Sequence, residues 1–373
     1  MSEWQNFKLR EVGTLQRGRS RHRPRYAFHL FNGPYPFIQT GEVREARKYV
    51  STFENTYSEA GLAQSKLWPK GTLCITIAAN IAELAILGFD ACFPDSVLGF
   101  IPDETRSDLD FVYYTLTHFQ KQLKHIGEGS VQDNINLGTF EDIEFPFPSL
   151  TEQKAIASVL SSLDDKIDLL HRQNKTLEAM AETLFRQWFI EEAKEDWIKG
   201  KVEDLFTLQR GYDLPSSKRI KGEFPLYAAS GLNDMINAYQ VEYPTVITGR
   251  SGSIGGVYIS LEKSWPLNTT LFIKEFKLGT LVFSYFYLKY LDLESFNAGS
   301  AVPSLNRNHV HGLEIQLPPS QLIKEYEEIA QDWMLKVKAN KHQIQTLENL
   351  RDTLLPKLMS GEVRVQYQTE EVA

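Results

Sequence analysis

Residues 152–189 read EQKAIASVLSSLDDKIDLLHRQNKTLEAMAETLFRQWF, and this stretch decides the fold. It contains a seam of positions at alternating spacings of four and three, all apolar but one: Ile156, Leu160, Leu163, Ile167, Leu170, Asn174, Leu177, Ala181, Leu184 and Trp188. A heptad pattern sustained over this length predicts a long coiled-coil helix. Ser149, followed three residues later by Glu152, is typical of a capping box at its start.

A second stretch has the same spacing. Its seam positions are Tyr326, Ala330, Trp333, Val337, Asn340, Ile344, Leu347, Arg351, Leu354 and Leu358. If the two helices pack antiparallel with Asn174 facing Asn340, Leu170 meets Ile344. A buried Asn pair can fix the register of two helices at a cost in stability. Alternatively, each Asn lies at the wet edge of the seam. Pro356 predicts a break in the last turn of the second helix.

The chain also resembles itself. The matches, in order, are Leu15-Gln16-Arg17-Gly18 with Leu208-Gln209-Arg210-Gly211, Pro36-Phe37-Ile38 with Pro225-Leu226-Tyr227, Gly129-Ser130 and Asn136 with Gly299-Ser300 and Asn306, and Thr176-Leu177-Glu178 with Thr346-Leu347-Glu348. Two copies are too few for a solenoid and indicate a pseudo-two-fold internal repeat.

Each copy has a mixed part followed by a helical part. The predicted boundaries are 1–150 for the first mixed domain, 151–195 for the first spacer helix, 196–318 for the second mixed domain, and 319–373 for the second spacer helix and tail. Short apolar runs between Gly and Pro predict strands, for example 73–78 and 84–89, and helices are expected near 108–123 and 281–291. The fold class is therefore α+β: two mixed α/β domains in tandem, separated by two long helices packed as an antiparallel coiled coil.

Composition is typical of a globular protein. Of 373 residues, 42% are apolar and 24% are charged, which argues against disorder and against a membrane protein. Cys74 and Cys92 are interpreted as reduced, buried thiols of a cytoplasmic protein. The net charge of −8, taken alone, argues against a nucleic-acid binder.

Catalytic signatures are mostly absent from the sequence. Residues 249–256, GRSGSIGG, fit no nucleotide-binding motif, so they are either a loop between strands or a nest of backbone N–H groups in which Arg250 helps to hold an anion. His309 and His311 have no Cys or third His nearby to complete a zinc site. Asp164 and Asp165 are expected on the exposed face of the first helix. The chain is therefore predicted not to be an enzyme, with no metal site and no cofactor of its own.

The local charge of two segments points the other way from the net charge of the chain. Residues 8–25 carry a net charge of +6, including the alternating series Arg17, Arg19, Arg21, Arg23 and Arg25. In an extended segment this alternation would place five guanidinium groups on one side, and Arg can bind a phosphate or a guanine edge bidentately. The corresponding place in the second copy contains Arg210, Lys218, Arg219 and Lys221, with Tyr212 among them. These clusters are either DNA-binding surfaces or solvated loops.

The sequence resembles the specificity (S) subunits of Type I restriction–modification enzymes over nearly its whole length. The stretches that carry the resemblance are Asn134-Ile135-Asn136-Leu137-Gly138, residues 152–157, 163–167, 172–178 and 184–189, Pro36-Phe37-Ile38-Gln39-Thr40-Gly41, and Trp265-Pro266-Leu267-Asn268-Thr269-Thr270-Leu271. The second helix departs from the family pattern at Leu322-Ile323, where Glu-Gln is usual.

The resemblance implies that each mixed domain is a target-recognition domain that reads one half of a split, asymmetric double-stranded DNA site, and that the helices set the gap. It also implies two methyltransferase (modification) subunits as partners, which use S-adenosylmethionine, and motor-nuclease (restriction) subunits, which use ATP and Mg. Arg17, Arg19, Arg21, Arg23, Arg25, Arg210, Lys218, Arg219, Lys221 and Arg250 are the predicted DNA-binding residues, chosen by charge and position. The alternative function is a coiled-coil scaffold that does not bind DNA.

Overall fold

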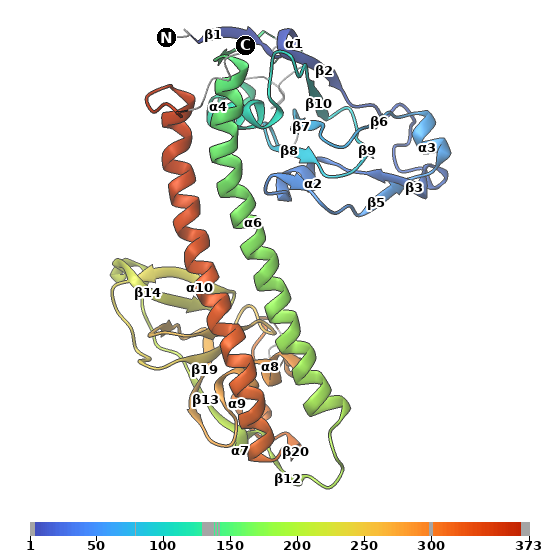
Figure 1. The fold of residues 1–373 in the computed structure, drawn as a ribbon. Helices are drawn as coiled ribbons and strands as arrows, with labels where there is room; N and C mark the ends of the chain where they lie inside the picture. The colour runs from blue at the N-terminus through green and yellow to red at the C-terminus, as the bar shows by residue number, and fades with distance from the viewer. Residues whose placement is uncertain are drawn as a thin grey trace. The chain divides into compact units, whose positions relative to one another are not determined.

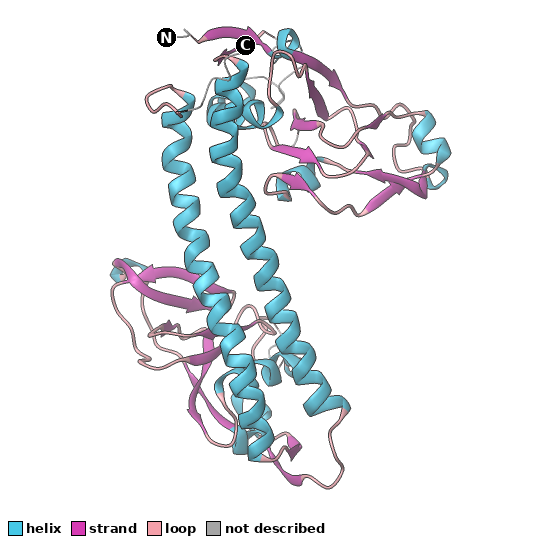
Figure 2. Cartoon of the chain, viewed as in Figure 1, coloured by secondary structure: helices cyan, strands magenta, loops and turns pink. Residues whose placement is uncertain are grey.

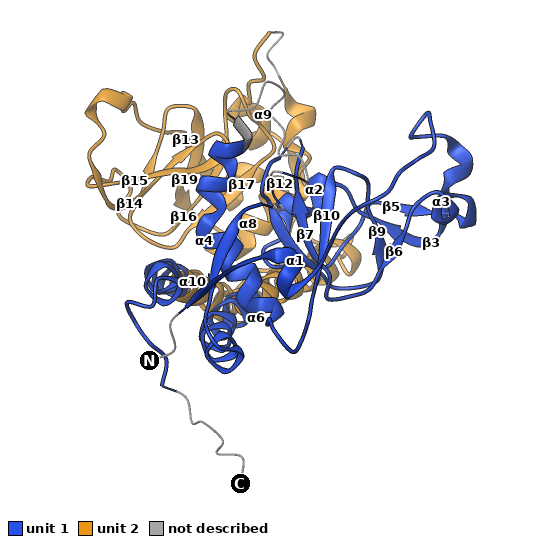
Figure 3. Ribbon diagram, turned by 90° about the horizontal axis from the view of Figure 1, so that it is seen from above, with its two compact units in different colours: residues 1–168, 345–373 blue, residues 169–344 orange. Residues whose placement is uncertain are grey.

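A computed structural model describes residues 4–78, 80–128, 138, 140, 142–297 and 301–366. It divides into two compact units: unit 1 is Met1–Asp168 with Gln345–Ala373, and unit 2 is Leu169–Ile344 (Figure 3). Each unit contains one of the two predicted mixed domains and a part of each long helix. The predicted boundaries after residues 150, 195 and 318 stay predictions. The motif residues 129, 130, 134–137, 299 and 300 lie outside the described part of the chain.

The two long helices form as the heptad pattern predicts. Helix α6 spans Leu150–Arg186 and continues into a π-helical turn η2 (Gln187–Glu191), and α10 spans Ser320–Met359 (Figures 1 and 2). At the start of α6, the Glu152 N–H donates to Ser149 Oγ over 3.3 Å. None of the predicted seam positions is fully exposed. The predicted break at Pro356 is wrong: the helix continues, because its neighbours Leu354, Leu355 and Leu358 are anchored in the core of unit 1.

Hydrogen bonds within unit 2 show that the two helices run antiparallel there. Asn340 Nδ2 donates to Asn174 Oδ1 over 2.8 Å, and the Tyr326 hydroxyl donates to the Ala181 carbonyl over 3.0 Å. The residue number falls on one helix as it rises on the other. Asn174 and Asn340 are 6% and 1% exposed, so neither lies at a wet edge. Coiled-coil packing along the full helices and the role of the Asn pair in fixing the register stay predictions.

The first of the two predicted exposed aspartates is not exposed. The Asp164 side chain is 12% exposed and forms an ion pair with Arg351 over 2.8 Å within unit 1, whereas Asp165 is exposed. The prediction for Asp164 is wrong because Arg351 approaches it from the other helix, and that neighbour cannot be read from the spacing on α6 alone.

The strands of unit 1 form two sheets and a separate strand pair. One sheet has the order β2-β10-β7-β8-β4, the other β5-β3-β9-β6, and β1 pairs with β11. The strands are β1 (Gln5–Lys8), β2 (Gly13–Arg17), β3 (Phe31–Phe37), β4 (Tyr49–Val50), β5 (Asn55–Tyr57), β6 (Leu67–Trp68), β7 (Leu73–Thr76), β8 (Leu84–Leu87), β9 (Ala91–Cys92), β10 (Val97–Pro102) and β11 (Glu144–Phe147). The helices are α1 (Leu9–Val12), η1 (Phe28–Leu30), α2 (Thr40–Glu45), α3 (Glu59–Ala63) and α4 (Leu109–Glu128). The predicted strands near 73–78 and 84–89 are β7 and β8, which pair antiparallel.

Unit 2 has the sheet orders β13-β19-β16-β17 and β15-β14-β18, and β12 pairs with β20. Its strands are β12 (Ile198–Lys201), β13 (Phe206–Arg210), β14 (Lys221–Ala228), β15 (Gly231–Ile236), β16 (Thr245–Gly249), β17 (Val257–Ser260), β18 (Trp265–Pro266), β19 (Thr270–Phe276) and β20 (Glu314–Leu317). Its helices are α7 (Val202–Leu205), η3 (Ser216–Lys218), α8 (Leu281–Tyr290), η4 (Leu293–Phe296) and α9 (Arg307–His311).

The internal repeat extends to local geometry. In unit 1 the Lys8 N–H donates to Glu11 Oε2 over 2.8 Å at the start of α1, between β1 and β2. In unit 2 the Lys201 N–H donates to Asp204 Oδ2 over 2.8 Å at the start of α7, between β12 and β13. Both carboxylates satisfy a backbone donor at the first turn of a short helix. The two copies therefore begin with the same strand–helix–strand element.

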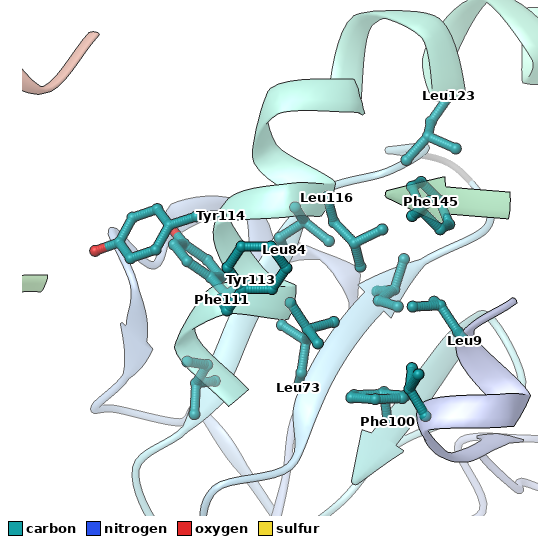
Figure 4. Packing of buried hydrophobic residues seen from close by; sticks show 14 of the residues in the cluster. Leu9, Leu73, Leu84, Phe100, Phe111, Tyr113, Tyr114, Leu116, Leu123 and Phe145 are labelled. Atoms are coloured by element: carbon teal, nitrogen blue, oxygen red, sulfur yellow. The ribbon is translucent and has the colours of Figure 1, made fainter. Parts of the chain in front are cut away.

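Each unit has its own hydrophobic core. In unit 1 the face of α4 that carries Phe111 and Leu116 packs with Leu73 and Phe100 from the sheet and with Phe145 (Figure 4). Leu358 and Met359 of α10 belong to the same cluster. The unit 2 core joins α8 and β13 to both long helices. In both units, apolar burial stabilises the mixed domain on the helices.

In unit 1 the junction between mixed domain and helices, the charged junction, contains buried ionic groups. The Lys48 ammonium, on a 5% exposed side chain, lies 3.0 Å from Asp110 Oδ1 and donates to Ser161 Oγ over 2.8 Å. Its contact with Asp110 is an ion pair without hydrogen-bond geometry. Nearby, the Tyr114 hydroxyl donates to Asp164 Oδ2 over 2.5 Å, and Arg351 donates to Asp164 Oδ1. Two cations and two carboxylates thus connect α4 with both long helices.

The corresponding place in unit 2, the aromatic junction, is built from rings. Phe189 lies 4.8 Å from Phe283 and 5.4 Å from Tyr326, measured between ring centroids. The Glu327 carboxylate accepts hydrogen bonds from the Val282 and Phe283 N–H groups, over 3.0 and 3.1 Å, at the start of α8. Thr280 Oγ1 donates to the same carboxylate over 2.6 Å. This carboxylate satisfies helix N-terminal donors that would otherwise lack partners.

Candidate nucleic-acid interface

The five arginines of the first copy lie at the end of β2 and in the loop that follows. We call residues 17–28 the first basic loop. All five side chains are exposed: Arg17, Arg19, Arg21, Arg23 and Arg25. Strand pairing ends at Arg17, and the chain turns where the Ala27 N–H donates to the Pro24 carbonyl over 3.3 Å. The strand-like alternation that we expected therefore stops at Arg17. The later arginines are exposed because they lie in a surface loop, not because they alternate along a strand.

The backbone of the first basic loop is held by the segment after α3. Gln64 Oε1 accepts from the backbone N–H of Arg21 over 2.6 Å and of His22 over 3.0 Å. Ser65 Oγ donates to the Arg19 carbonyl over 2.8 Å. The loop is therefore fixed at its centre, and its side chains are displayed from an ordered backbone.

The arginines differ in how far they are already paired. Arg25 forms an ion pair with Asp95 over 3.0 Å, and Arg17 Nε donates to the Asp95 carbonyl. Arg23 donates to the Ser20 carbonyl over 2.8 Å. Within the described residues, the guanidinium groups of Arg19 and Arg21 form no hydrogen bond or ion pair. These two are the cations most available to an external anion.

Lys66 is a further cation that sequence reasoning missed. Its ammonium donates to Gln16 Oε1 over 2.7 Å and lies 3.6 Å from the centroid of the Trp68 ring. Burial, and then the nearby charge of Arg19, lower its pKa from the ordinary value. No sequence signal pointed to it, because only the fold brings residue 66 beside β2.

The second basic loop, residues 210–221, connects β13 with β14 as the first connects β2 with β3. Arg210, Lys218 and Lys221 are exposed, and Arg210 lies 3.9 Å from Asp213. Arg219 donates to the Leu214 carbonyl through Nε over 3.3 Å and to Asn233 Oδ1 over 3.2 Å. Arg219 therefore holds the loop together, Arg210 has Asp213 beside it, and the exposed Lys218 and Lys221 are the cations most available to an external ligand.

The first three N–H groups of the loop around Arg250 are not free to form an anion nest. It connects β16 with β17, and the N–H groups of Arg250 and Ser251 donate to the Thr269 carbonyl over 2.8 and 3.1 Å. The Gly252 N–H donates to the Pro303 carbonyl over 3.0 Å. A nest needs free N–H groups, so these three cannot form one. The Arg250 guanidinium is half-buried and donates to the Asn268 carbonyl over 3.2 Å.

Comparison with known proteins identifies the family. The family model described as the Type I restriction modification DNA specificity domain matches residues 1–179 and 194–349. The chain belongs to this family. It is similar to the Type I restriction enzyme MjaIX specificity subunit of Methanocaldococcus jannaschii, with 25% identity over 98% of this chain and 94% of that protein. A specificity subunit of Mycoplasma genitalium, S.MgeORF438P, described as putative, is 26% identical over 69% of this chain and 72% of that protein.

A solved structure has the same fold. The crystal structure of the Type I restriction-modification S subunit from M. genitalium matches with a TM-score of 0.70 at 20% identity, over 99% of this chain and 97% of that one. The predicted α+β class, with two mixed domains in tandem and long helices, is therefore confirmed. The comparisons give no support to the scaffold that does not bind DNA.

In this specificity subunit, sequence reasoning also missed exposed apolar side chains in the basic loops. Tyr26 is 72% exposed, Phe28 is 85% exposed and Ile220 is 63% exposed. Their positions beside Arg25, Arg219 and Lys221 are visible in the sequence. The signal was present, but exposure cannot be read from an isolated aromatic residue.

The specificity subunit offers no metal site in the described residues: no group of three or more His, Cys, Asp or Glu side chains could hold an ion. His311 instead accepts a hydrogen bond at Nε2 from the Leu208 N–H over 2.8 Å. Cys74 and Cys92 are buried and free, and burial raises the pKa of Cys92 to about 11. Among the described helices, none is both long and apolar enough to span a bilayer.

Proposed function

We propose that this chain is the non-catalytic DNA-recognition subunit of a Type I restriction–modification complex, and that each mixed domain reads one half of a split, asymmetric site in double-stranded DNA. The observation that carries the proposal is that a basic loop follows the equivalent strand in both units, after Leu15-Gln16-Arg17-Gly18 and after Leu208-Gln209-Arg210-Gly211. Cations on both copies suit a ligand with a repeated negative charge. Unequal domains predict unequal half-sites.

The long helices act as the spacer between the half-sites. Helix α6 has 37 residues and α10 has 40. At 1.5 Å per residue, such helices are about 55–60 Å long. Major-groove contacts one turn apart on the same face of B-DNA are separated by about 34 Å. The helices are thus long enough to separate two reading domains by one turn of DNA.

The remaining activities belong to partner subunits. Two modification subunits supply methyl transfer from S-adenosylmethionine, and motor-nuclease subunits supply translocation and cleavage with ATP and Mg. An apolar groove of unit 2, lined by Met180, Leu184 and Trp333 among others, offers a docking surface on the helices. We place the complex in the cytoplasm, where the DNA is.

Methylome sequencing tests this function. We compare the host with and without this gene, after a pull-down has identified the products of neighbouring genes that bind the chain. We expect adenine methylation to disappear at one split motif when the gene is deleted. An unchanged methylome in a host with an active modification subunit would contradict the proposal.

A salt titration tests the basic loops. Arg21→Gln should weaken binding to all duplexes alike and reduce the slope of log K against log salt by about one unit, because one phosphate contact is lost. Arg44→Gln is the matched control, since Arg44 is an exposed arginine of the same unit that lies near Glu45, outside the loop. Equal slopes for Arg21→Gln and the control would remove Arg21 from the interface.

A further inference from the structure

Phe28 is an unusual surface residue. Its side chain is 85% exposed, and the neighbouring Tyr26 is 72% exposed. A large apolar ring gains free energy when it leaves water, so two exposed rings in one loop can contribute binding energy to a ligand that covers them.

The exposure of Phe28 is built into the fold. Phe28 begins the short helix η1, whose last residue, Leu30, is 1% exposed and lies in a hydrophobic cluster with Phe37 and Tyr57. Ser58 holds this turn through two hydrogen bonds. Its hydroxyl donates to the His29 carbonyl over 2.7 Å, and its backbone N–H donates to the Leu30 carbonyl over 2.9 Å. The ring is thus presented from a rigid base, which reduces the entropy lost on binding.

The surroundings of Phe28 are cationic. The rings of His22 and His29 meet edge to face at 4.9 Å, so the part of the loop that carries Arg21 and Arg23 lies against the turn that carries Phe28. Tyr26 follows Arg25 directly, and its ring stacks on Phe31 with centroids 6.3 Å apart. An apolar side chain that is surrounded by guanidinium groups suits a ligand with an anionic backbone and apolar faces. Bases in a DNA groove have this chemistry.

The second basic loop has the same design with a different residue. Ile220 is 63% exposed and lies between Arg219 and Lys221. Its carbonyl accepts the Asn237 N–H over 2.9 Å, so its backbone is also anchored while its side chain points away from the core. An anchored turn, nearby cations and exposed apolar side chains thus occur together at the equivalent connection in both copies.

We propose that Phe28, for one half-site, and Ile220, for the other, are apolar base-contacting residues that determine specificity, while the exposed cations of the same loops that have no partner within the loop, such as Arg21 and Lys221, bind phosphates. This rests on the proposed function, because it assigns roles within the same DNA-binding loops. Contacts to phosphates carry no sequence information, and apolar contacts to base edges do. The aromatic ring and the β-branched side chain differ in shape, which is consistent with unequal half-sites.

The test uses the complex of the full chain with its modification subunits. Binding is measured by fluorescence anisotropy to duplexes that carry the motif found by methylome sequencing, with each base pair of both half-sites replaced in turn. Phe28→Ala should lose discrimination by about tenfold at one or two adjacent positions of one half-site. Ile220→Ala should do so in the other half-site. Both variants should keep the wild-type salt slope, and Phe28→Leu should retain part of the discrimination.

Phe53→Ala is the matched control, because Phe53 is another exposed phenylalanine of unit 1, packs on Phe89 and precedes an acidic residue. It should discriminate as the wild type does. Unchanged discrimination in Phe28→Ala, or an equal loss on every duplex, overturns the inference. If Phe28→Ala instead loses its bound modification subunits, the Phe28 ring contacts a protein partner, and the inference is also overturned. If the wild-type complex itself shows no sequence preference, the proposed function fails and the inference fails with it.

Discussion

The charged junction of unit 1 and the aromatic junction of unit 2 perform the same task with opposite chemistry. In the first, Lys48 and Asp164 are largely buried, and they pair with Asp110 and Arg351, whose side chains are 31% and 29% exposed. In the second, Phe189 packs against Phe283 and Tyr326. Both attach a mixed domain to the same two helices. The repeat therefore retains where a domain is attached and the apolar core that attaches it, but not the ionic or aromatic contacts that are added to this core.

The difference predicts different sensitivities. A buried ion pair contributes little net stability, because desolvation offsets the attraction, but loss of one partner leaves an isolated buried charge. Aromatic packing contributes in proportion to the area buried and responds to changes in volume. Burial raises the pKa of Tyr326, the tyrosine of this junction, further above its ordinary value, so its hydroxyl stays protonated. We therefore expect that removal of a single charge strongly destabilises the charged junction. Changes in ring volume should destabilise the aromatic junction in proportion to the apolar area that is lost.

Removal of Arg351 should break the charged junction and have the largest effect. Arg351→Met leaves the Asp164 carboxylate, which is 12% exposed, without its cation. We expect the free energy of unfolding to fall by about 3–5 kcal/mol in denaturant titrations of the full chain. The double variant Arg351→Met, Asp164→Asn removes both charges, and Asn can still accept from Tyr114, so much of the loss should return. A double variant as unstable as the single one would refute the argument.

Loss of the Glu327 charge tests the polar part of the aromatic junction. Glu327→Gln keeps the shape but weakens the hydrogen bonds from Thr280, Val282 and Phe283. We expect a loss of about 1–3 kcal/mol, because the donors are those of a helix N-terminus and the acceptor is charged. Glu328→Gln, at the exposed position next to it, should change stability by less than about 0.5 kcal/mol. Similar effects from both variants would show that the cap is unimportant.

Sequence periodicity predicted the long helices but only part of the contacts around them. The spacing from Ile156 to Trp188 determines which face of α6 is covered, because helical side chains repeat in a fixed pattern. It could not place Asp164 beside Arg351, since that pair depends on how two helices are aligned. Similarly, charge found the first basic loop, but the nest at Arg250 failed because carbonyl partners came from Thr269 and Pro303. The local sequence pattern predicts helices and strands. Contacts between residues far apart in the sequence decide which polar groups remain free to bind a ligand.

The pair of Asn174 and Asn340 lies in unit 2. Its replacement measures how much stability a buried polar group costs in the unit whose junction is mainly aromatic. Asn340 Nδ2 donates to Asn174, but Asn340 Oδ1 is buried without a hydrogen-bond partner. The double variant Asn174→Leu, Asn340→Leu should therefore raise the free energy of unfolding by about 1–2 kcal/mol, while alternative helix registers become accessible. Thermal unfolding measures the first effect, and disulfide trapping between cysteines placed at shifted seam positions measures the second. A clear loss of stability would contradict this interpretation.

The smallest expected effect is a pH dependence at β13 of unit 2. Burial, and then the charge of Arg307, lower the pKa of His311 below its ordinary value of 6.5, and its neutral Nε2 accepts the Leu208 N–H. Since the folded pKa is the lower one, this contribution is complete above pH 6.5 and is lost as the pH falls toward the folded pKa. Hydrogen exchange of a peptide covering β13 should therefore accelerate, relative to its intrinsic rate, between pH 7.5 and pH 5.5 by about a few-fold. His311→Gln keeps an acceptor that does not titrate, so it should abolish the acceleration; if the variant shows the same pH dependence, another group in unit 2 is responsible.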